Sequence, residues 1–283
     1  MYDFKIGAML ESFKLPLPEA LALMSDMKIG GTQMYATKGQ YAPENMTHSA
    51  RVELLNAVEG HGLSFSALCG DLGCGLGNAE MNPALIEKSK RIMELALDLN
   101  TNIITTHIGV IPDNEDHDRY KIMQDACHEL SNFAGSMGAY FAVETGPETA
   151  VILRRFLDGI GSRGIAVNLD PANLVMVTGD DPVQAVYTLK DYIVHTHAKD
   201  GRKLRESNPE VIYKIIEDVI GGCKYFEELP LGEGDVDFSA YLKALDDVGY
   251  KGFLTIEREV GENPSEDIKR AARFLREKIA ERR

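Results

Sequence analysis

The 283-residue sequence lacks the features that mark membrane, secreted or repetitive proteins. It has no apolar run that approaches the ~18 residues required for a membrane span. Its first residues, MYDFKIGAML, show no basic segment followed by a long apolar core, so we expect no secretory signal peptide. Linkers, low-complexity segments and short tandem repeats are also missing. These absences favour a cytoplasmic globular protein with no membrane partner.

Cysteine and positive charge are both scarce. The four cysteines do not form the dense framework of a secreted mini-domain, and we expect free thiols in a reducing cytoplasm. We interpret Cys69 and Cys74 as plain loop residues, because their spacing matches no metal motif. The formal net charge is -14. Because phosphate binding relies on clustered Lys and Arg, this charge argues against a nucleic-acid partner.

The apolar pattern alternates between two periods along the chain. Short β-rich runs span residues 4–10, 30–36, 63–70, 102–110, 139–146, 164–170, 192–200 and 252–259. Stretches with helical spacing lie between and after them, including 82–100, 121–138 and 263–283, the last with Ser265 as its expected N-cap. Strand followed by helix, repeated in this way, predicts an α/β fold. We expect one (β/α)8 TIM barrel that forms a single domain over residues 1–283.

One connection in this pattern is longer than the others. Residues 202–236 carry an extra helical pattern at 208–222, before the segment LPLGEGDVDF. A long excursion after a strand commonly builds a functional site or a lid. We therefore predict a loop-helix excursion beside the site.

Polar residues stand at the ends of the later predicted strands. In barrels of this kind, the chemistry sits at the carboxyl ends of the strands. The residues there are His107, Glu144, Asp170 with Asn173 close behind, His195, His197, Glu257 and Glu259. Because alternate strand residues face opposite sides, polar residues interleaved with apolar ones indicate that the polar set points into the barrel.

Carboxylates that converge at one rim repel each other, so a positive charge should lie among them. We predict a divalent metal held by Glu144, Asp170, His197 and Glu257. This oxygen-rich set with one imidazole suits Mn2+, Mg2+ or Co2+ and admits Zn2+. His107 is expected to hydrogen-bond the substrate. His195 lies one layer deeper by parity, which favours a structural role. One interpretation of Lys199 and Asp200 pairs them with each other at the loop mouth.

Six motifs, taken in order, resemble the xylose-isomerase-like TIM-barrel superfamily, often labelled sugar phosphate isomerases/epimerases. They are THIG, VETG, NLDPANL, VHTHAKDG, LGEGDVDF and TIERE, and the resemblance runs nearly end to end. It implies one divalent metal, with Mn2+ as the first choice, on the same four side chains. In the ketose 3-epimerase branch the metal-bound glutamates also move protons, which implies catalytic roles for Glu144 and Glu257. They would form and reprotonate the enediolate of a ketose or related keto-sugar.

The resemblance also implies roles for residues around the metal. Arg202 and His107 would bind substrate hydroxyls or the developing oxyanion. Asn173 stands where the 3-epimerase branch usually carries histidine, and we assign it to the substrate-binding set. Glu233, in the LGEG loop, is expected to hold that loop around the site. His195 and Lys199 are expected to support the site. By analogy with the superfamily we expect a homodimer or homotetramer.

Three alternatives remain open at the level of the sequence. The motif HTHAKDGRK is closer to the inosose dehydratase branch, so the protein could be a lyase acting on a cyclitol ketone or an oxidised glycoside. A non-catalytic sugar-binding protein is the second, although the ligand set is complete. The third is an apurinic endonuclease, which needs three zincs; here Phe226 and Glu228 stand where an Asp-x-His pair is required. The sequence shows no Gly-rich loop with adjacent basic residues of the kind that binds phosphate. This absence favours a non-phosphorylated substrate.

Overall fold

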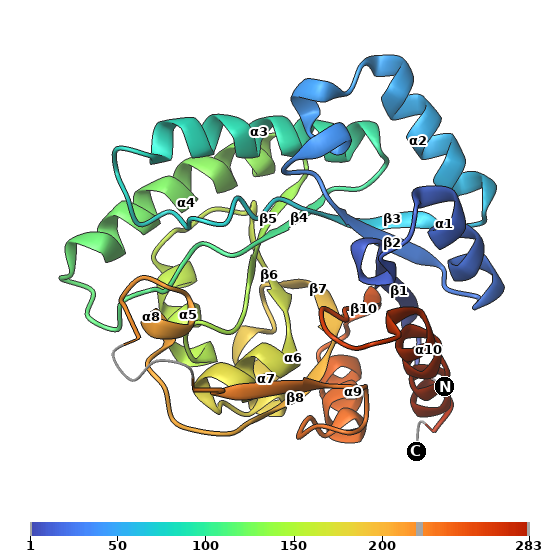
Figure 1. Cartoon of the computed structure of the whole chain (residues 1–283). Coiled ribbons are helices and arrows are strands. Elements are labelled where there is room, and N and C mark those ends of the chain that lie inside the picture. Colours follow the sequence, from blue (N-terminus) through green and yellow to red (C-terminus); the bar gives the residue numbers. More distant parts are fainter. Residues whose placement is uncertain (1, 219–222, 282–283) are drawn as a thin grey trace.

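The computed structural model describes residues 2–218 and 223–281. Eight parallel strands form a closed barrel in the order β1-β10-β7-β6-β5-β4-β3-β2 (Figure 1). These strands are β1 (Lys5–Met9), β2 (Gly31–Tyr35), β3 (Ser64–Cys69), β4 (Ile103–Thr106), β5 (Tyr140–Glu144), β6 (Ile165–Leu169), β7 (Ile193–Ala198) and β10 (Phe253–Ile256). The closed barrel confirms the predicted (β/α)8 fold.

Helices connect the strands and pack on the outside of the barrel (Figure 1). The longer ones are α1 (Leu17–Asp26), α2 (His48–Gly60), α3 (Asn82–Asp98), α4 (Asp118–Ser136), α5 (Ala150–Asp158), α7 (Pro182–Leu189), α9 (Phe238–Asp247) and α10 (Pro264–Ala280). Short helical turns are η1 (Glu11–Phe13), η2 (Gly39–Tyr41), η3 (Pro43–Asn45), α6 (Pro171–Asn173) and η4 (Leu174–Thr178). None of the helices in the described ranges has both the length and the hydropathy to cross a membrane.

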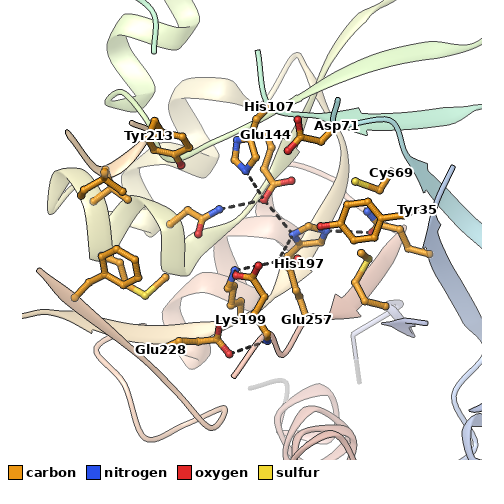
Figure 2. Close-up of a pocket in the computed structure, with 18 residues that line it drawn as sticks. Tyr35, Cys69, Asp71, His107, Glu144, His197, Lys199, Tyr213, Glu228 and Glu257 are labelled. Atoms are coloured by element: carbon orange, nitrogen blue, oxygen red, sulfur yellow. Dashed lines mark hydrogen bonds and ion pairs between the residues drawn. The ribbon is translucent and has the colours of Figure 1, made fainter. Parts of the chain in front are cut away.

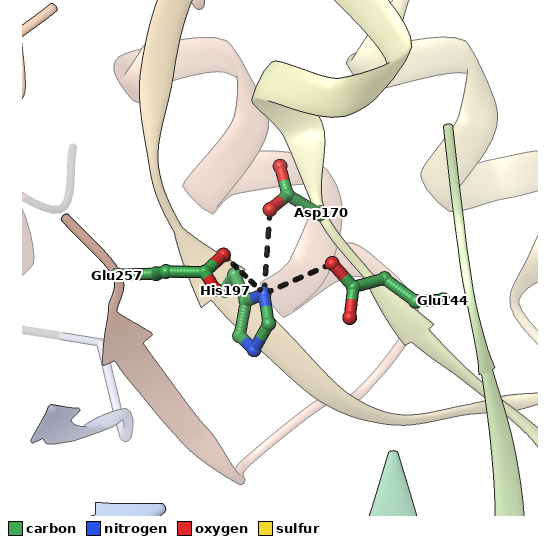
Figure 3. Close-up of side chains that lie close together, drawn as sticks. All are labelled: Glu144, Asp170, His197 and Glu257. Atoms are coloured by element: carbon green, nitrogen blue, oxygen red, sulfur yellow. Dashed lines mark hydrogen bonds and ion pairs between the residues drawn. The ribbon is translucent and has the colours of Figure 1, made fainter. Parts of the chain in front are cut away.

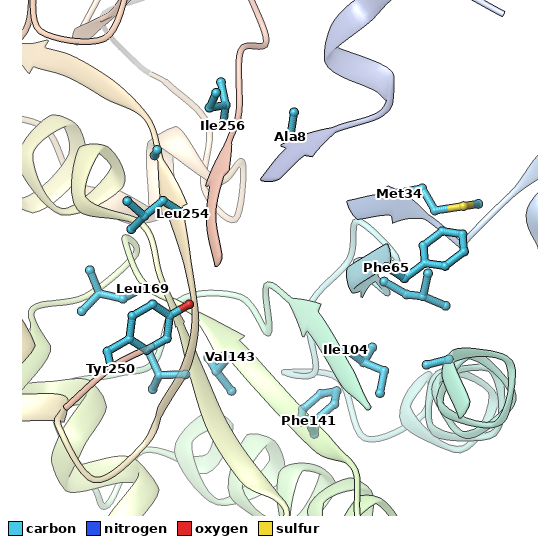
Figure 4. Packing of buried hydrophobic residues seen from close by; sticks show 14 of the residues in the cluster. Ala8, Met34, Phe65, Ile104, Phe141, Val143, Leu169, Tyr250, Leu254 and Ile256 are labelled. Atoms are coloured by element: carbon cyan, nitrogen blue, oxygen red, sulfur yellow. The ribbon is translucent and has the colours of Figure 1, made fainter. Parts of the chain in front are cut away.

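The core lies between the strands and the surrounding helices. Met34, Ile104 and Val143 come from three barrel strands (Figure 4) and join one hydrophobic cluster with Ile92 of α3 and Tyr241 of α9. Each is at most 1% exposed. Burying a side chain of this size stabilises the fold by about 1.5–3 kcal/mol. The period of two along each strand therefore places the apolar residues against the helices and leaves the other face to line the barrel.

Glycines make room where β1, β2 and β10 meet. A Cβ on Gly31 would lie 2.4 Å from Cε1 of Phe253, and a Cβ on Gly7 would lie 2.9 Å from Oγ1 of Thr255. Gly7 pairs with both Gly31 and Thr255 in the barrel register. The side chains of β10 thus occupy space that neighbouring strands leave free.

The long connection differs from the prediction. It contains an antiparallel pair, β8 (Asp200–Lys203) with β9 (Phe226–Leu229), and a short α8 (Pro209–Ile212). The prediction of a helix over 208–222 is wrong for most of its described length, because Lys214 adopts a left-handed φ of 59° that interrupts it; residues 219–222 lie outside the described ranges. The cap of α10 is Asn263, not Ser265, since the Asn263 side chain accepts from the Glu266 N–H and Pro264 opens the helix.

Asp200 ties the two ends of this connection together. Its carboxylate is 1% exposed and accepts four backbone N–H bonds of 2.8–3.2 Å, from Gly201, Gly232, Gly234 and Val236. A Cβ on Gly234 would lie 2.1 Å from Oδ1 of Asp200, so glycine is required there for the close approach. The interpretation that pairs Asp200 with Lys199 is therefore wrong, because Asp200 serves the loop instead.

Replacing Asp200 by alanine is expected to lower the free energy of unfolding by about 3 kcal/mol, because buried N–H groups lose a charged acceptor. Urea denaturation measures this change. The matched control is Asp235→Ala in the same loop, an exposed carboxylate, which should change stability by no more than about 0.5 kcal/mol. Equal stability of the two variants would contradict the anchoring role.

Candidate metal centre

Four side chains converge at the carboxyl ends of neighbouring strands. Glu144 ends β5, Asp170 follows β6, His197 lies near the end of β7, and Glu257 follows β10. One potential ligand atom from each lies within 4.8 Å of all the others (Figure 3). The fold therefore brings together the four side chains that parity had selected.

The imidazole stands at the centre of the three carboxylates. Nδ1 of His197 lies 3.2 Å from Oε2 of Glu257, 3.3 Å from Oδ2 of Asp170 and 3.5 Å from Oε1 of Glu144. All four side chains are buried. Burial disfavours a charged imidazole, yet the surrounding carboxylates raise the pKa of His197 well above its ordinary value. The cluster thus attracts positive charge, and its oxygen-rich donor set fits one divalent cation.

Gln33 of β2 fixes the orientation of the histidine ring. Nε2 of His197 lies 3.1 Å from Oε1 of Gln33, and Nε2 of Gln33 donates to Oγ1 of Thr105 at 2.9 Å. With Nε2 beside the amide oxygen of Gln33, Nδ1 is the ring nitrogen that faces the three carboxylates, and it is the nitrogen that would bind a cation placed among them. A metal-binding histidine usually has such a partner on its other nitrogen.

A polar layer supports the cluster from below. Asn168 donates to Oε2 of Glu144 at 3.1 Å, and its Oδ1 lies 2.8 Å from Nδ1 of His195. Nε2 of His195 in turn lies 2.9 Å from Oγ1 of Thr255. Burial, together with nearby His197, holds the pKa of His195 well below its ordinary value, so the ring is neutral. His195 thus lies beneath the cluster, at the depth predicted by parity.

A cavity of about 230 Å³ opens above the cluster (Figure 2). Side chains from many strand ends and loops line it: Met9, Gln33, Tyr35, Cys69, Asp71, His107, Glu144, Asn173, Met176, Val177, His197, Lys199, Ile212, Tyr213, Phe226, Glu228, Glu257 and Glu259. The mixture of apolar walls and converging polar groups is typical of a small-molecule site.

Lys199 is the buried cation of this cavity wall. It is 4% exposed, and its Nζ lies 3.2 Å from Oε2 of Glu257 and 2.6 Å from Oε2 of Glu259. Burial disfavours the ammonium, but Glu257, Asp170 and Glu259 raise its pKa well above the ordinary value. Lys199 therefore contacts the cluster of carboxylates rather than its sequence neighbour Asp200.

A model of the family described as "Xylose isomerase-like TIM barrel" matches residues 21–278. The chain belongs to this family. An inosose dehydratase from Clostridium perfringens is 26% identical over 168 residues, which cover 57% of this chain and 55% of that protein. The chain thus spans about half the length of this curated relative.

Two solved structures show the same fold. A xylose isomerase domain protein from Planctomyces limnophilus has a TM-score of 0.77 at 24% identity, covering 99% of this chain and 98% of its own. The 3-keto-D-glucoside 4-epimerase YcjR from E. coli has a TM-score of 0.73 at 18% identity, covering 97% of this chain and 99% of its own. The proteins similar to this chain thus include one named a dehydratase, by sequence, and one named an epimerase, by fold.

The other predicted site residues divide into two groups. His107 and Asn173 line the cavity and approach Oε1 of Glu144, at 3.5 Å from Nε2 of His107 and 3.0 Å from Nδ2 of Asn173. Arg202 and Glu233 are absent from the described lining of the cavity. Arg202 donates to the backbone oxygen of Glu233 at 2.7 Å, and the Glu233 carboxylate pairs with Arg270 of α10 at 2.6 Å. Arg202 therefore makes a contact within the loop, and Glu233 connects the loop to α10.

Several lining residues were missed by reasoning from the sequence. Gln33 could have been found, because in the run 30–36 it is a polar residue on the strand face opposite to Met34. Asp71 and Tyr213 lie in loops, where no periodicity places them. The interpretation of Cys69 as a plain loop residue is wrong, because it ends β3 and lines this cavity. Cys74 lies in a loop, as predicted, and lines a neighbouring cavity.

After reloading with Mn2+, the wild-type protein is expected to hold one divalent ion per chain, because all four ligand atoms share a single site. Glu144→Ala and His197→Ala should each lose that ion, as measured by elemental mass spectrometry. Glu44→Ala and His48→Ala are matched controls at exposed positions. Retention of the ion in both cluster variants would contradict this site.

Gln33→Leu is expected to weaken Mn2+ binding by about 10- to 100-fold, because the ring of His197 loses its orienting acceptor. Metal titration calorimetry measures the change in Kd. Gln33→Glu keeps an oxygen acceptor and should bind the ion more tightly than Gln33→Leu. A wild-type Kd in Gln33→Leu would show that the amide does not orient the ligand.

Proposed function

We propose that the protein is a divalent-metal-dependent isomerase or epimerase acting on a ketose or related keto-sugar. One observation carries the proposal: Glu144 and Glu257 lie on opposite sides of His197 in the cluster (Figure 3). Inversion at a carbon beside a carbonyl needs one group to remove the proton and another to return it on the opposite face. Two carboxylates that flank one site meet this requirement.

The residues of the cluster would divide the work. Glu144, Asp170, His197 and Glu257 would hold a divalent cation, with Mn2+ as first choice and Mg2+, Co2+ or Zn2+ also accommodated. When bound, it would supply Lewis acidity to the substrate carbonyl and so acidify the neighbouring C–H. Asp170 is 0% exposed and is absent from the described lining of the cavity, so we assign it a ligand role only. Two glutamates remain in the cavity wall to move protons.

The two glutamates have different neighbours. The oxygens of Glu144 accept from the amides of Asn173 and Asn168, whereas Oε2 of Glu257 contacts the ammonium of Lys199. A carboxylate beside an ammonium is the weaker base. We therefore assign removal of the substrate proton to Glu144 and its return on the opposite face to Glu257. His107, whose Nε2 lies on the same side as Glu144, offers a contact for a substrate hydroxyl.

Dehydration of a cyclitol ketone is the second candidate. The curated relative from C. perfringens is named an inosose dehydratase. That reaction shares the proton abstraction but expels a hydroxyl from the next carbon. The Nζ of Lys199 lies beside Glu257 in the cavity wall and offers an N–H donor to a departing hydroxyl.

Incubation of the Mn2+-loaded protein with keto-sugars and cyclitol ketones in heavy water tests the proposal. We expect deuterium to enter at the carbon next to the carbonyl, detected by NMR. Glu144→Gln and Glu257→Gln should lower the exchange rate by about 10²-fold or more, because each removes a proton-transfer group. Glu44→Gln, at an exposed position, is the control.

The products then separate the candidates. An epimer or isomer that carries deuterium supports the first function, and loss of water from the substrate supports the second. Absence of exchange with every compound in the metal-loaded protein would contradict both.

A further inference from the structure

A second cavity of about 280 Å³ adjoins the metal cavity. Asp71, His107 and Tyr213 line both cavities, and Figure 2 shows these three side chains on one side of the metal cluster. We propose that the second cavity is a subsite for a neutral, partly apolar substituent of the reacting sugar, such as an aromatic aglycone. The substrate is then a glycoside rather than a free monosaccharide. This inference deepens the proposed function and rests on it for the position of the reacting ring.

The size of the metal cavity supports a second compartment. Its 230 Å³ lies below the range of about 300–1,000 Å³ that ligand pockets usually have. A substrate larger than one sugar ring must extend beyond it. The second cavity lies beyond His107 and Tyr213, which line both cavities. The rings of these two residues make an edge contact, with 5.6 Å between their centroids.

Two loops form a firm wall for this second cavity. The loop after β3 is held to the loop after β4 by a backbone bond of 2.8 Å from the N–H of Leu76 to the oxygen of Ile108. Gly75 has a φ of 62°, and a Cβ there would lie 2.8 Å from the same oxygen. Only glycine permits this close approach, so the contact between the two loops is built into the sequence.

The lining favours an uncharged group with an apolar face. Ile108, Val110, Met123 and Ile215 contribute aliphatic surface, and glycines expose backbone between them. The charge of Arg119 is neutralised by an ion pair with Glu210 of α8. Asp71 also lines the cavity, and the described lining residues offer no unpaired cation. A phosphate would therefore be repelled by a carboxylate and find no balancing positive charge.

Two buried nitrogens lack partners beside this space. Nδ1 of His107 and Nε of Arg119 have no hydrogen-bond partner within the described part of the chain. Buried polar atoms are rarely left unpaired in folded proteins. Both belong to residues that line the second cavity, and a glycosidic or hydroxyl oxygen of a bound ligand would supply an acceptor.

Calorimetry with non-reacting ligands tests the subsite without relying on turnover. The probes are matched methyl and phenyl glycosides, α and β, of glucose, galactose and mannose, titrated into the Mn2+-loaded protein. We expect at least one phenyl glycoside to bind about tenfold more tightly than its methyl partner, a difference of about 1.4 kcal/mol. Cys74→Trp and Ile215→Trp narrow the cavity from two sides, and both should abolish this advantage. Val151→Trp, at a position of α5 that is 65% exposed, should retain it.

The result can overturn the subsite independently of catalysis. If no phenyl glycoside binds better than its methyl partner, or if the advantage survives both narrowing variants, the second cavity does not hold the substituent. Heavy-water exchange on free keto-sugars can still succeed in that case, and the proposed function would stand. Conversely, a phenyl preference without any exchange would retain the subsite and reject the chemistry.

Discussion

Mutual repulsion among three buried carboxylates is the constraint on which this site depends. Glu144, Asp170 and Glu257 surround one imidazole at the rim of the barrel, each at most 8% exposed. Such an arrangement is costly unless positive charge lies among them. Lys199 supplies some of that charge at the edge of the cluster, and a divalent cation fits the centre. The closed parallel barrel makes the convergence possible because the carboxyl ends of its strands share one rim.

The surrounding residues act by limiting how these four groups can move. Gln33 sets the ring of His197, Asn168 connects Glu144 to His195, and Lys199 holds Glu257. Each support comes from a different strand or strand end, so the geometry of the cluster is a property of the whole barrel. Ligand positions held in this way favour chemistry that needs two bases at fixed places around one substrate carbon.

Periodicity accounts for what could be predicted from the sequence. The eight alternating runs predict the barrel, and parity at their ends selects the four clustered residues. One error has a different cause: Lys199 lies between β7 and β8, where its ammonium meets Glu257 and Glu259, while the Asp200 carboxylate is taken up by backbone N–H groups of the loop. Gln33 was open to reasoning from parity. The second cavity was not, because its walls join residues that lie far apart in the sequence, such as Asp71, Arg119 and Tyr213. Lys214 ended the predicted helix through a backbone conformation that no pattern signals.

The most direct test of the central claim is anomalous X-ray scattering from crystals grown with Mn2+. The account predicts one strong peak within bonding distance of Glu144, Asp170, Glu257 and the Nδ1 atom of His197. Gln33 should remain on Nε2. A peak elsewhere, or several peaks that divide the four side chains, would contradict a single metal centre shared by these residues. Coordination through Nε2 would contradict the orientation of the ring by Gln33.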